Sequence, residues 1–251
     1  MIMAKQDIAV RSNKTIYRDG DLCYKVFEKG YSKADILNEA LNQARVEDTG
    51  LFIPKVHEVK LLDDGRLAIV MDYIEGKSLA KLMEENPSKR DEYLARFVDI
   101  QKTMYGLSSP NLNKQRDKFN NKISHSGLEA TIRYELHVRL NGMPNHNKLC
   151  HGDFNPSNVI ITPDDRACII DWSHATIGNA SADAARTYLL YMLADDKKTA
   201  EDYLALFCKK TDTARQYVDQ WLPIVAASQM VKGKPEEKAF LERWASVCQY
   251  E

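Results

Sequence analysis

The stretch "LCHGDFNPSNVIITPDDRACIIDW", residues 149–172, constrains the fold more than any other part of the sequence. It holds two short apolar runs, "NVIIT" and "ACIID", joined by the turn signal "PDD". Polar residues flank this predicted β-hairpin: Asp153 and Asn158 precede its first strand, and Asp171 follows its second. Because the outer ends of a hairpin meet in space, Asn158 and Asp171 are predicted to lie close together.

The spacing of these polar residues points to one kind of chemistry. Asn158 stands five positions after Asp153, and Asp171 stands thirteen positions after Asn158. In kinase-type catalytic loops an Asp faces the acceptor hydroxyl, an Asn binds a metal ion, and a second Asp binds the same metal. Two converging oxygen ligands are typical of Mg²⁺ held beside a triphosphate. The alternative, that these are turn residues capping a hairpin, explains each residue singly but not the offsets.

The first part of the chain alternates between strand and helix patterns. Residues 32–48 carry apolar side chains at helical spacing, and Ser32 is the predicted N-cap. Strands are predicted on both sides of this helix, where short β-branched or aromatic runs are separated by turn signals. These predicted strands cover residues 7–11, 15–19, 22–27, 56–62 and 66–73.

The rest of the chain is predicted to be mostly helical, apart from the hairpin. Apolar spacings of three and four residues predict helices at 89–107, 182–193, 200–208, 213–231 and 235–250. Pro235 fits the first turn of the last one. The predicted fold class is therefore α+β, with a small β-rich N-terminal lobe, a connector near 72–78, and a larger helical lobe that carries the hairpin.

Composition excludes several kinds of partner and location. The formal net charge is −1, so no general attraction to nucleic acid or to an anionic membrane is expected. The sequence contains no run of 18 apolar residues, so no membrane span is predicted. The start "MIMAKQDIAV" does not fit a secretory signal. The five cysteines are far apart and form no C-x-x-C pair, which favours a reduced, cytoplasmic protein. The oligomeric state is not predicted.

The segments "HGDFNPSNVI" and "IIDW" resemble the signature of the aminoglycoside phosphotransferase/choline kinase-type small-molecule kinases, a family similar in fold to protein kinases. The resemblance extends over nearly the full chain. It implies transfer of the γ-phosphate of ATP to a hydroxyl of a small molecule, with Asp153 as the catalytic residue and Asn158 and Asp171 as Mg²⁺ ligands. It also implies a nucleotide-binding lobe at 1–74 and a catalytic, substrate-binding lobe at 75–251.

The resemblance assigns further residues to the nucleotide. Lys25, on the third predicted strand, is expected to hold the α- and β-phosphates and to pair with Glu39 on the following helix. The alternative for Lys25 is a solvated strand residue. Backbone groups near Asp72 and Ile74 are expected to pair with the adenine edge, with Met71 behind the ring. The alternative for this segment is a simple linker between lobes.

The sequence departs from the protein-kinase pattern in three places. No G-x-G-x-x-G occurs near the N-terminus, so Ser12, Asn13 and Lys14 are candidate donors to the phosphates. The segment after Asp171 is short and lacks an A-P-E motif, which argues against a polypeptide acceptor. Asp183 matches the family pattern only in part: either it hydrogen-bonds the catalytic-loop backbone, or it is an ordinary first-turn acid.

The charge pattern bears on the acceptor. Residues 107–148 contain seven Lys or Arg and three acids, and residues 195–251 contain nine and ten. Neither segment is the acidic basin that a polycation needs, which favours a neutral or anionic acceptor such as a sugar or an amino alcohol. The alternative is that these charges face solvent and say nothing about the pocket.

Other functional alternatives remain open at this stage. A choline-like quaternary amine requires an aromatic box, and the candidate rings belong equally well to a core. These rings are Trp172, Tyr188, Tyr217 and Trp221. The remaining alternatives are a choline/ethanolamine- or sugar-type kinase of the same family, and a non-catalytic nucleotide-binding protein with a kinase-like fold.

Overall fold

The computed structural model describes residues 6–11 and 13–246, which form two compact units. The first unit consists of the described residues up to Ser88 together with Pro156–Ala175. The second consists of Lys89–Asn155 and the described residues from Thr176 onward. The predicted hairpin therefore belongs to the same compact unit as the N-terminal strands. The lobe boundary at residue 74 stays a prediction.

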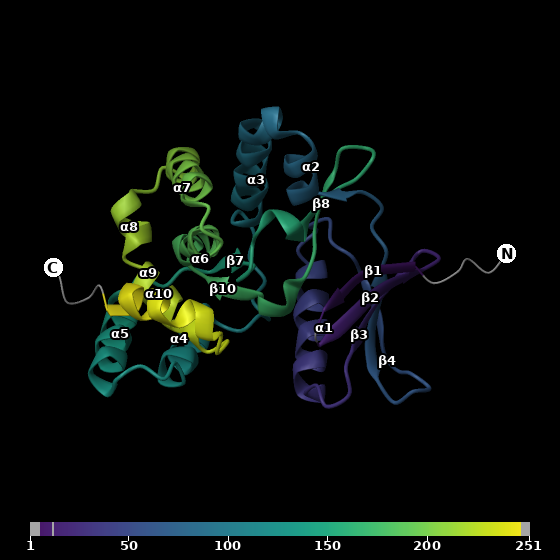
Figure 1. Ribbon diagram of the computed structural model, residues 1–251, viewed down its shortest axis with the longest axis horizontal. Helices are drawn as coiled ribbons and strands as arrows, with labels where there is room; N and C mark the ends of the chain where they lie inside the picture. The colour runs from purple at the N-terminus through teal and green to yellow at the C-terminus, as the bar shows by residue number, and fades with distance from the viewer. Residues whose placement is uncertain (1–5, 12, 247–251) are drawn as a thin grey trace. The chain divides into compact units, whose positions relative to one another are not determined.

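The first unit is built on a five-stranded antiparallel sheet with the strand order β1-β2-β3-β5-β4 (Figure 1). The predicted order of three strands, one helix and two strands is confirmed. Ser32 caps the helix as predicted, because its side chain accepts a hydrogen bond from the backbone N–H of Asp35. The elements are β1 (Gln6–Arg11), β2 (Lys14–Asp19), β3 (Leu22–Phe27), α1 (Lys33–Glu47), β4 (Val56–Leu61) and β5 (Leu67–Asp72).

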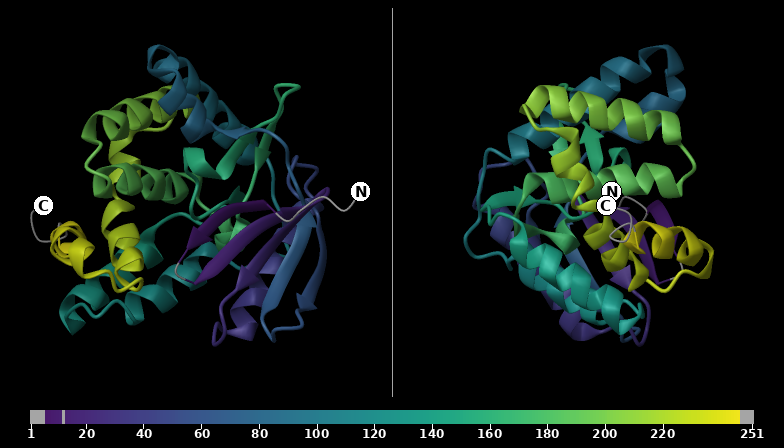
Figure 2. Two further views of the ribbon diagram at one scale, coloured as in Figure 1. Left: turned by 45° about the vertical axis from the view of Figure 1, so that its right-hand side comes forward. Right: turned by 90° about the vertical axis from the view of Figure 1, so that its left-hand side faces the viewer.

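Helix α1 lies against one face of this sheet, as the left view of Figure 2 shows. Phe27 and Ile69 from the sheet and Ile36 and Ala40 from α1 are buried in the layer between them. Each large apolar side chain buried in this way contributes about 1.5–3 kcal/mol. Since side chains alternate along a strand, Lys25 shares the face of Phe27 and points toward α1.

The predicted hairpin is confirmed as β8 (Val159–Ile161) and β9 (Ala167–Ile169), flanked by the 3₁₀ turns η2 (Pro156–Asn158) and η3 (Trp172–His174). A short strand that the sequence did not predict, β6 (Lys77–Ser78), pairs with β8 and leads into α2 (Leu79–Glu85).

Gly76 makes the pairing of β6 with β8 possible. Its φ is +149°, and a Cβ there would lie 2.3 Å from the carbonyl oxygen of Ile161. Only glycine avoids both problems.

The second unit is mainly helical, with a small two-stranded sheet. The single helix predicted at 213–231 is wrong: the chain forms α8 (Arg215–Asp219) and then α9 (Leu222–Met230). Pro223 explains the break, because proline fits a first helical turn and cannot continue a helix through its interior. The other elements are α3 (Arg90–Met104), α4 (Gln115–Ser124), α5 (Ala130–Gly142), β7 (Lys148–Cys150), β10 (Thr176–Gly178), α6 (Ala180–Leu193), α7 (Lys197–Thr211) and α10 (Pro235–Ala245).

Two negative findings apply to the described part of the chain. None of its helices has the length and apolar character needed to cross a membrane. No disulfide joins the cysteines that the structure describes, Cys23, Cys150, Cys168 and Cys208.

Candidate active site

The two ends of the hairpin meet, as the sequence predicted. The backbone N–H of Ile170 donates to the carbonyl of Asn158 at 2.9 Å, which joins the ends beside Asp171. Asn158 and Asp171 both line a cavity of about 520 Å³ in the first unit. Asp171 has φ +63°, a left-handed conformation that costs a non-glycine residue about 1–3 kcal/mol and occurs most often at functional sites.

Lys25 is held between two carboxylates on the wall of the same cavity. Its ammonium pairs with Glu39 of α1 and lies 3.0 Å from Oδ1 of Asp171. Lys25 is only 4% exposed. Burial lowers its pKa, but Asp171 and Glu39 raise the pKa by more, so the net shift is upward and the ammonium stays charged. The solvated alternative for Lys25 is therefore excluded.

The turn between β1 and β2 brings a second lysine to Asp171. Lys14 Nζ lies 3.9 Å from Oδ2 of Asp171. Burial and the charge of Lys25 lower the pKa of Lys14 to about 8. Of the other two candidate donors in this turn, Asn13 is exposed and Ser12 lies outside the described residues. The structure thus places one of the three candidate donors, Lys14, at the predicted metal ligand.

The residues predicted to contact adenine, Met71, Asp72 and Ile74, line the same cavity and are called the hinge residues below. The Asp72 N–H donates to the carbonyl of Lys55 at 3.0 Å, and the Asp72 carboxylate accepts from the Lys55 N–H and contacts the ring of His57. These contacts hold the Asp72 N–H and side chain within the sheet. The predicted pairing with adenine therefore rests on the Asp72 carbonyl and on the backbone of Ile74.

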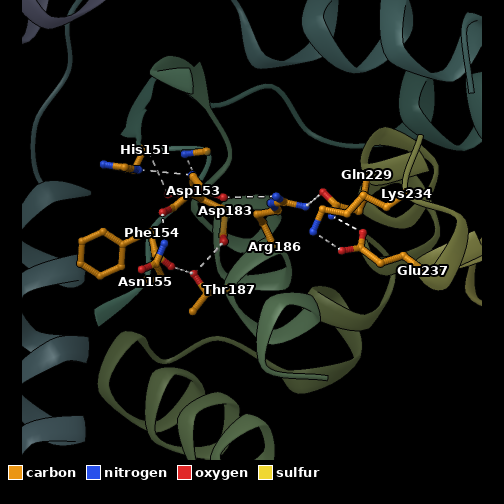
Figure 3. Close-up of polar contacts among 11 residues, drawn as sticks. His151, Asp153, Phe154, Asn155, Asp183, Arg186, Thr187, Gln229, Lys234 and Glu237 are labelled. Carbon is orange, nitrogen blue, oxygen red and sulfur yellow. Dashed lines mark hydrogen bonds and ion pairs between the residues drawn. The ribbon is translucent and has the colours of Figure 1, made fainter. Parts of the chain in front are cut away.

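The loop that contains Asp153 belongs to the second unit and is tied down by hydrogen bonds (Figure 3). The Asp153 N–H donates to Nδ1 of His151 at 3.3 Å, and the Asn155 side chain donates to the Asp153 carbonyl at 2.9 Å. Gly152 has φ +79°, which other residues rarely adopt. The loop therefore holds Asp153 in one fixed, non-helical conformation.

Asp183 anchors this loop from the first turn of α6. Its carboxylate accepts hydrogen bonds from the backbone N–H of His151 at 3.0 Å, from that of Gly152 at 2.7 Å, and from the hydroxyl of Tyr105 at 3.1 Å. Burial raises the pKa of Asp183 against these hydrogen bonds, which lower it. Of the two alternatives for Asp183, the structure supports the one in which it holds the loop backbone.

Arg186 is a site residue that the sequence reasoning missed. One of its nitrogens donates to Oδ1 of Asp153 at 3.2 Å, and another donates to Gln229 of α9. Gln229 in turn donates to Glu237 in the first turn of α10. Arg186 is only 7% exposed. Its spacing of three from Asp183, which puts both on one face of α6, was the available signal.

The sequence falls within a known family. The phosphotransferase enzyme family matches residues 6–219. The chain belongs to this family. No curated protein matches the sequence.

Solved structures share the fold. An aminoglycoside phosphotransferase APH(4)-Ia, in a ternary complex with ADP and hygromycin B, is similar with a TM-score of 0.71 at 14% identity, over 97% of this chain and 91% of that one. The choline kinase LicA from Streptococcus pneumoniae has a TM-score of 0.64 at 15% identity, over 96% and 91%. A choline/ethanolamine kinase family protein from Mesorhizobium loti has a TM-score of 0.60 at 17% identity, over 92% and 78%. The chain therefore has the α+β, protein kinase-like fold.

Proposed function

We propose that the protein transfers the γ-phosphate of ATP, in the presence of Mg²⁺, to a hydroxyl group of a small molecule. The observation that carries this proposal is the contact of Lys25 with both Glu39 and Asp171 on a cavity that Asn158 and the hinge residues also line. A lysine and a metal-binding aspartate on one pocket are the parts that phosphoryl transfer requires, because positioning and charge stabilisation supply most of its catalysis. The ADP bound to the similar APH(4)-Ia structure supports a nucleotide for this cavity.

The donors in the cavity fit a magnesium ion. Asn158 and Asp171 offer an amide and a carboxylate oxygen from adjacent ends of one hairpin, and Mg²⁺ prefers oxygen ligands. Such an ion would neutralise charge that develops on the phosphate oxygens during transfer. Lys25, fixed by Glu39, would bind the phosphates, and Lys14, which lies 3.9 Å from Asp171, would assist in place of a glycine-rich loop.

Asp153 acts on the acceptor in this proposal. Its carboxylate accepts a hydrogen bond from the acceptor hydroxyl and aims the oxygen at the γ-phosphorus. Since the transition state is loose, complete proton removal is not needed early. Arg186 is a positioning residue here: its contact at 3.2 Å stabilises the charged, acceptor form of the Asp153 carboxylate.

Two features of the structure bear on the kind of acceptor. Only residues 172–179 separate Asp171 from α6, and η3 and β10 occupy most of that segment, so there is little chain for docking a polypeptide. Three of the four candidate rings, those of Trp172, Tyr188 and Trp221, are buried, which argues against an aromatic box for a quaternary ammonium. The cysteines among the described residues are all free, which suits a reducing compartment, and we propose a cytoplasmic location.

Calorimetry of ATP binding, with and without Mg²⁺, tests the nucleotide half of the proposal. We expect binding to tighten with Mg²⁺ in the wild type, and this gain to disappear in Asp171→Ala. Asp164→Asn, an exposed acid on the same hairpin, is the matched control and should behave as wild type. Equal affinity with and without Mg²⁺ would contradict the assignment of Asn158 and Asp171.

Release of ADP with a panel of hydroxyl compounds and peptides tests the transfer half. We expect turnover with at least one small hydroxyl compound and none with peptides. Tight Mg²⁺-ATP binding without transfer to any acceptor would favour the non-catalytic alternative.

A further inference from the structure

A group of basic side chains surrounds Asp153 in the second unit. Lys118 and Lys122 lie four residues apart, on one face of α4, and Lys232 follows the end of α9. Helices α4 and α6 both pack against α9. The charges of Arg186 and Asp153 act on each of the three lysines. We call Lys118, Lys122 and Lys232 the lysine cluster.

Each acidic group near the lysine cluster has a partner outside the cluster. Asp153 is in contact with Arg186, and the buried Asp183 accepts hydrogen bonds from the loop backbone. Glu237 accepts from both Gln229 and Lys234. Among residues 6–11 and 13–246, no carboxylate lies within ion-pair distance of the ammonium groups of Lys122 and Lys232. Positive charge therefore exceeds negative charge around Asp153.

The neighbouring positive charges and burial together lower the pKa values of two lysines in the cluster. Burial and the charge of Lys122 lower the pKa of Lys118 to about 7, although Asp183 and Asp153 oppose the shift. Burial and the charges of Arg186 and Lys232 lower the pKa of Lys122 to about 8. Like charges held close together disfavour one another, and an anion among them removes that penalty.

The structure points to an acceptor with its own negative charge. We propose that the small molecule phosphorylated by this protein carries an anionic group, a carboxylate or a phosphate ester, which the lysine cluster binds while a hydroxyl of the same molecule faces Asp153. This inference rests on the proposed function. It also predicts selectivity against a polycationic acceptor such as an aminoglycoside, which a cluster of cations would repel.

The chemical step balances without a further reactant. The hydroxyl oxygen forms a bond to the γ-phosphorus of ATP as the bond between that phosphorus and the β–γ bridging oxygen breaks. The hydroxyl proton passes to Asp153 and then to solvent. The products are ADP and an acceptor that bears a new phosphate ester beside its original anionic group.

Two sets of matched probes test the charge of the acceptor. The first set is glucose 1-phosphate, glucose and glucosamine; the second is glycerol 3-phosphate, glycerol and serinol. ADP release with Mg²⁺-ATP is measured for each compound at constant ionic strength, and binding of each is measured by calorimetry with saturating Mg²⁺-ADP. We expect the anionic member to have the highest kcat/KM in at least one set.

Variants of the lysine cluster connect the preference to these residues. Lys122→Gln and Lys232→Gln should each raise the KM for the preferred anionic probe roughly 10-fold, while kcat stays within about twofold. Lys122→Arg should restore most of the affinity, because it keeps the charge. Lys209→Gln, an exposed lysine in α7, is the matched control and should change nothing. Binding of the ATP analogue AMP-PNP should be the same in all of these variants.

The remaining outcomes would count against the anionic acceptor, against the proposed function, or against both. A neutral or cationic probe with the highest kcat/KM in both sets would overturn the anionic acceptor. The same conclusion follows if Lys122→Gln weakens AMP-PNP binding and leaves the anionic probe unaffected. If no probe is phosphorylated but glucose 1-phosphate or glycerol 3-phosphate binds through Lys122, the proposed function fails and the anion site remains. If neither anionic probe binds, the anion site fails as well.

Discussion

The two units arrange their positive charges in different ways. In the first unit, Lys25 is buried between the carboxylates of Glu39 and Asp171, so its charge is compensated before any ligand arrives. In the second unit, the charges of Arg186 and of the lysine cluster act together around Asp153, and basic groups outnumber acidic ones there. The comparison suggests that the first unit takes its phosphates together with a metal ion, whereas the second takes an anion that the protein alone must neutralise.

The largest effect is expected at the acid of the second unit. Asp153→Asn should cut phosphoryl transfer roughly 10²-fold or more, because in the proposed mechanism the carboxylate acts on the hydroxyl in the transition state. Affinity for Mg²⁺-ATP should remain nearly intact, since Asp153 is not assigned to the nucleotide. Single-turnover kinetics and calorimetry measure the two quantities. Transfer at close to the wild-type rate would show that the base lies elsewhere.

The corresponding change in the first unit should have the opposite signature. Asp171→Asn should weaken Mg²⁺ and ATP binding together, by about 10- to 100-fold, because it removes the charge of one of the two proposed Mg²⁺ ligands and of a partner of Lys25. Titration of Mg²⁺ at fixed ATP, and of ATP at fixed Mg²⁺, checks this. A loss confined to kcat, with both affinities unchanged, would contradict the role of Asp171.

The anchor of the Asp153 loop should affect stability as well as turnover. Asp183→Asn replaces one accepting oxygen by an NH₂ group, so a loop N–H of His151 or Gly152 loses its partner. An unsatisfied buried donor costs about 1–3 kcal/mol in the free energy of unfolding. Urea denaturation gives this quantity, with Asp91→Asn, an exposed acid on α3, as the control. Unchanged stability would show that the carboxylate does not hold the loop.

The smallest effect concerns the pH dependence of stability from the lysine cluster. The pKa of Lys118 is about 7 in the folded protein and near 10.5 when unfolded, so between these values the unfolded chain binds more protons. Stability from this residue therefore rises with pH across that window. The variant Lys118→Met has no ammonium at this position and therefore lacks this pH-dependent contribution to stability.

The test for Lys118 compares the two proteins at several pH values. The advantage of Lys118→Met over the wild type in the free energy of unfolding should be largest near pH 7 and shrink toward pH 10. Lys122, Arg186, Asp153 and Asp183 also act on this ammonium and are common to both proteins. A constant difference across pH would mean that Lys118 is not desolvated.

The parts of the fold that were predictable have local signals. Strand alternation, helical spacing and turn residues gave the order of elements in the first unit, and the hairpin carried its polar residues at fixed offsets. The Lys25–Glu39 ion pair was predicted from the resemblance to the kinase family, and the sheet and α1 do bring those two positions together. The break before α9 was misjudged because Pro223 lies within an otherwise continuous helical pattern.

The parts that were not predictable depend on contacts between segments distant in the sequence. Asp153 and Arg186 are 33 residues apart, and Arg186 and Gln229 are 43 apart. No local pattern pairs them, because helix packing decides which residues of α6 and α9 meet. The lysine cluster shows the same limit. Residue counts indicated a basic segment, but only the structure shows that Lys118 and Lys122 lie close enough to Asp153 for its charge to act on them.

The contact of Arg186 with Gln229, and of Gln229 with Glu237, ties the first turn of α10 to the carboxylate of Asp153. For protein engineering, this means that α10 supports the position of Arg186 and should be kept in a shortened protein. A chain shortened before Pro235 would lose Glu237 and leave Gln229 free to turn away from Arg186. A tag fused after Ala245 should leave these contacts in place. A tag that displaces α10 would remove the contact that holds Gln229 against Arg186, the residue that orients Asp153.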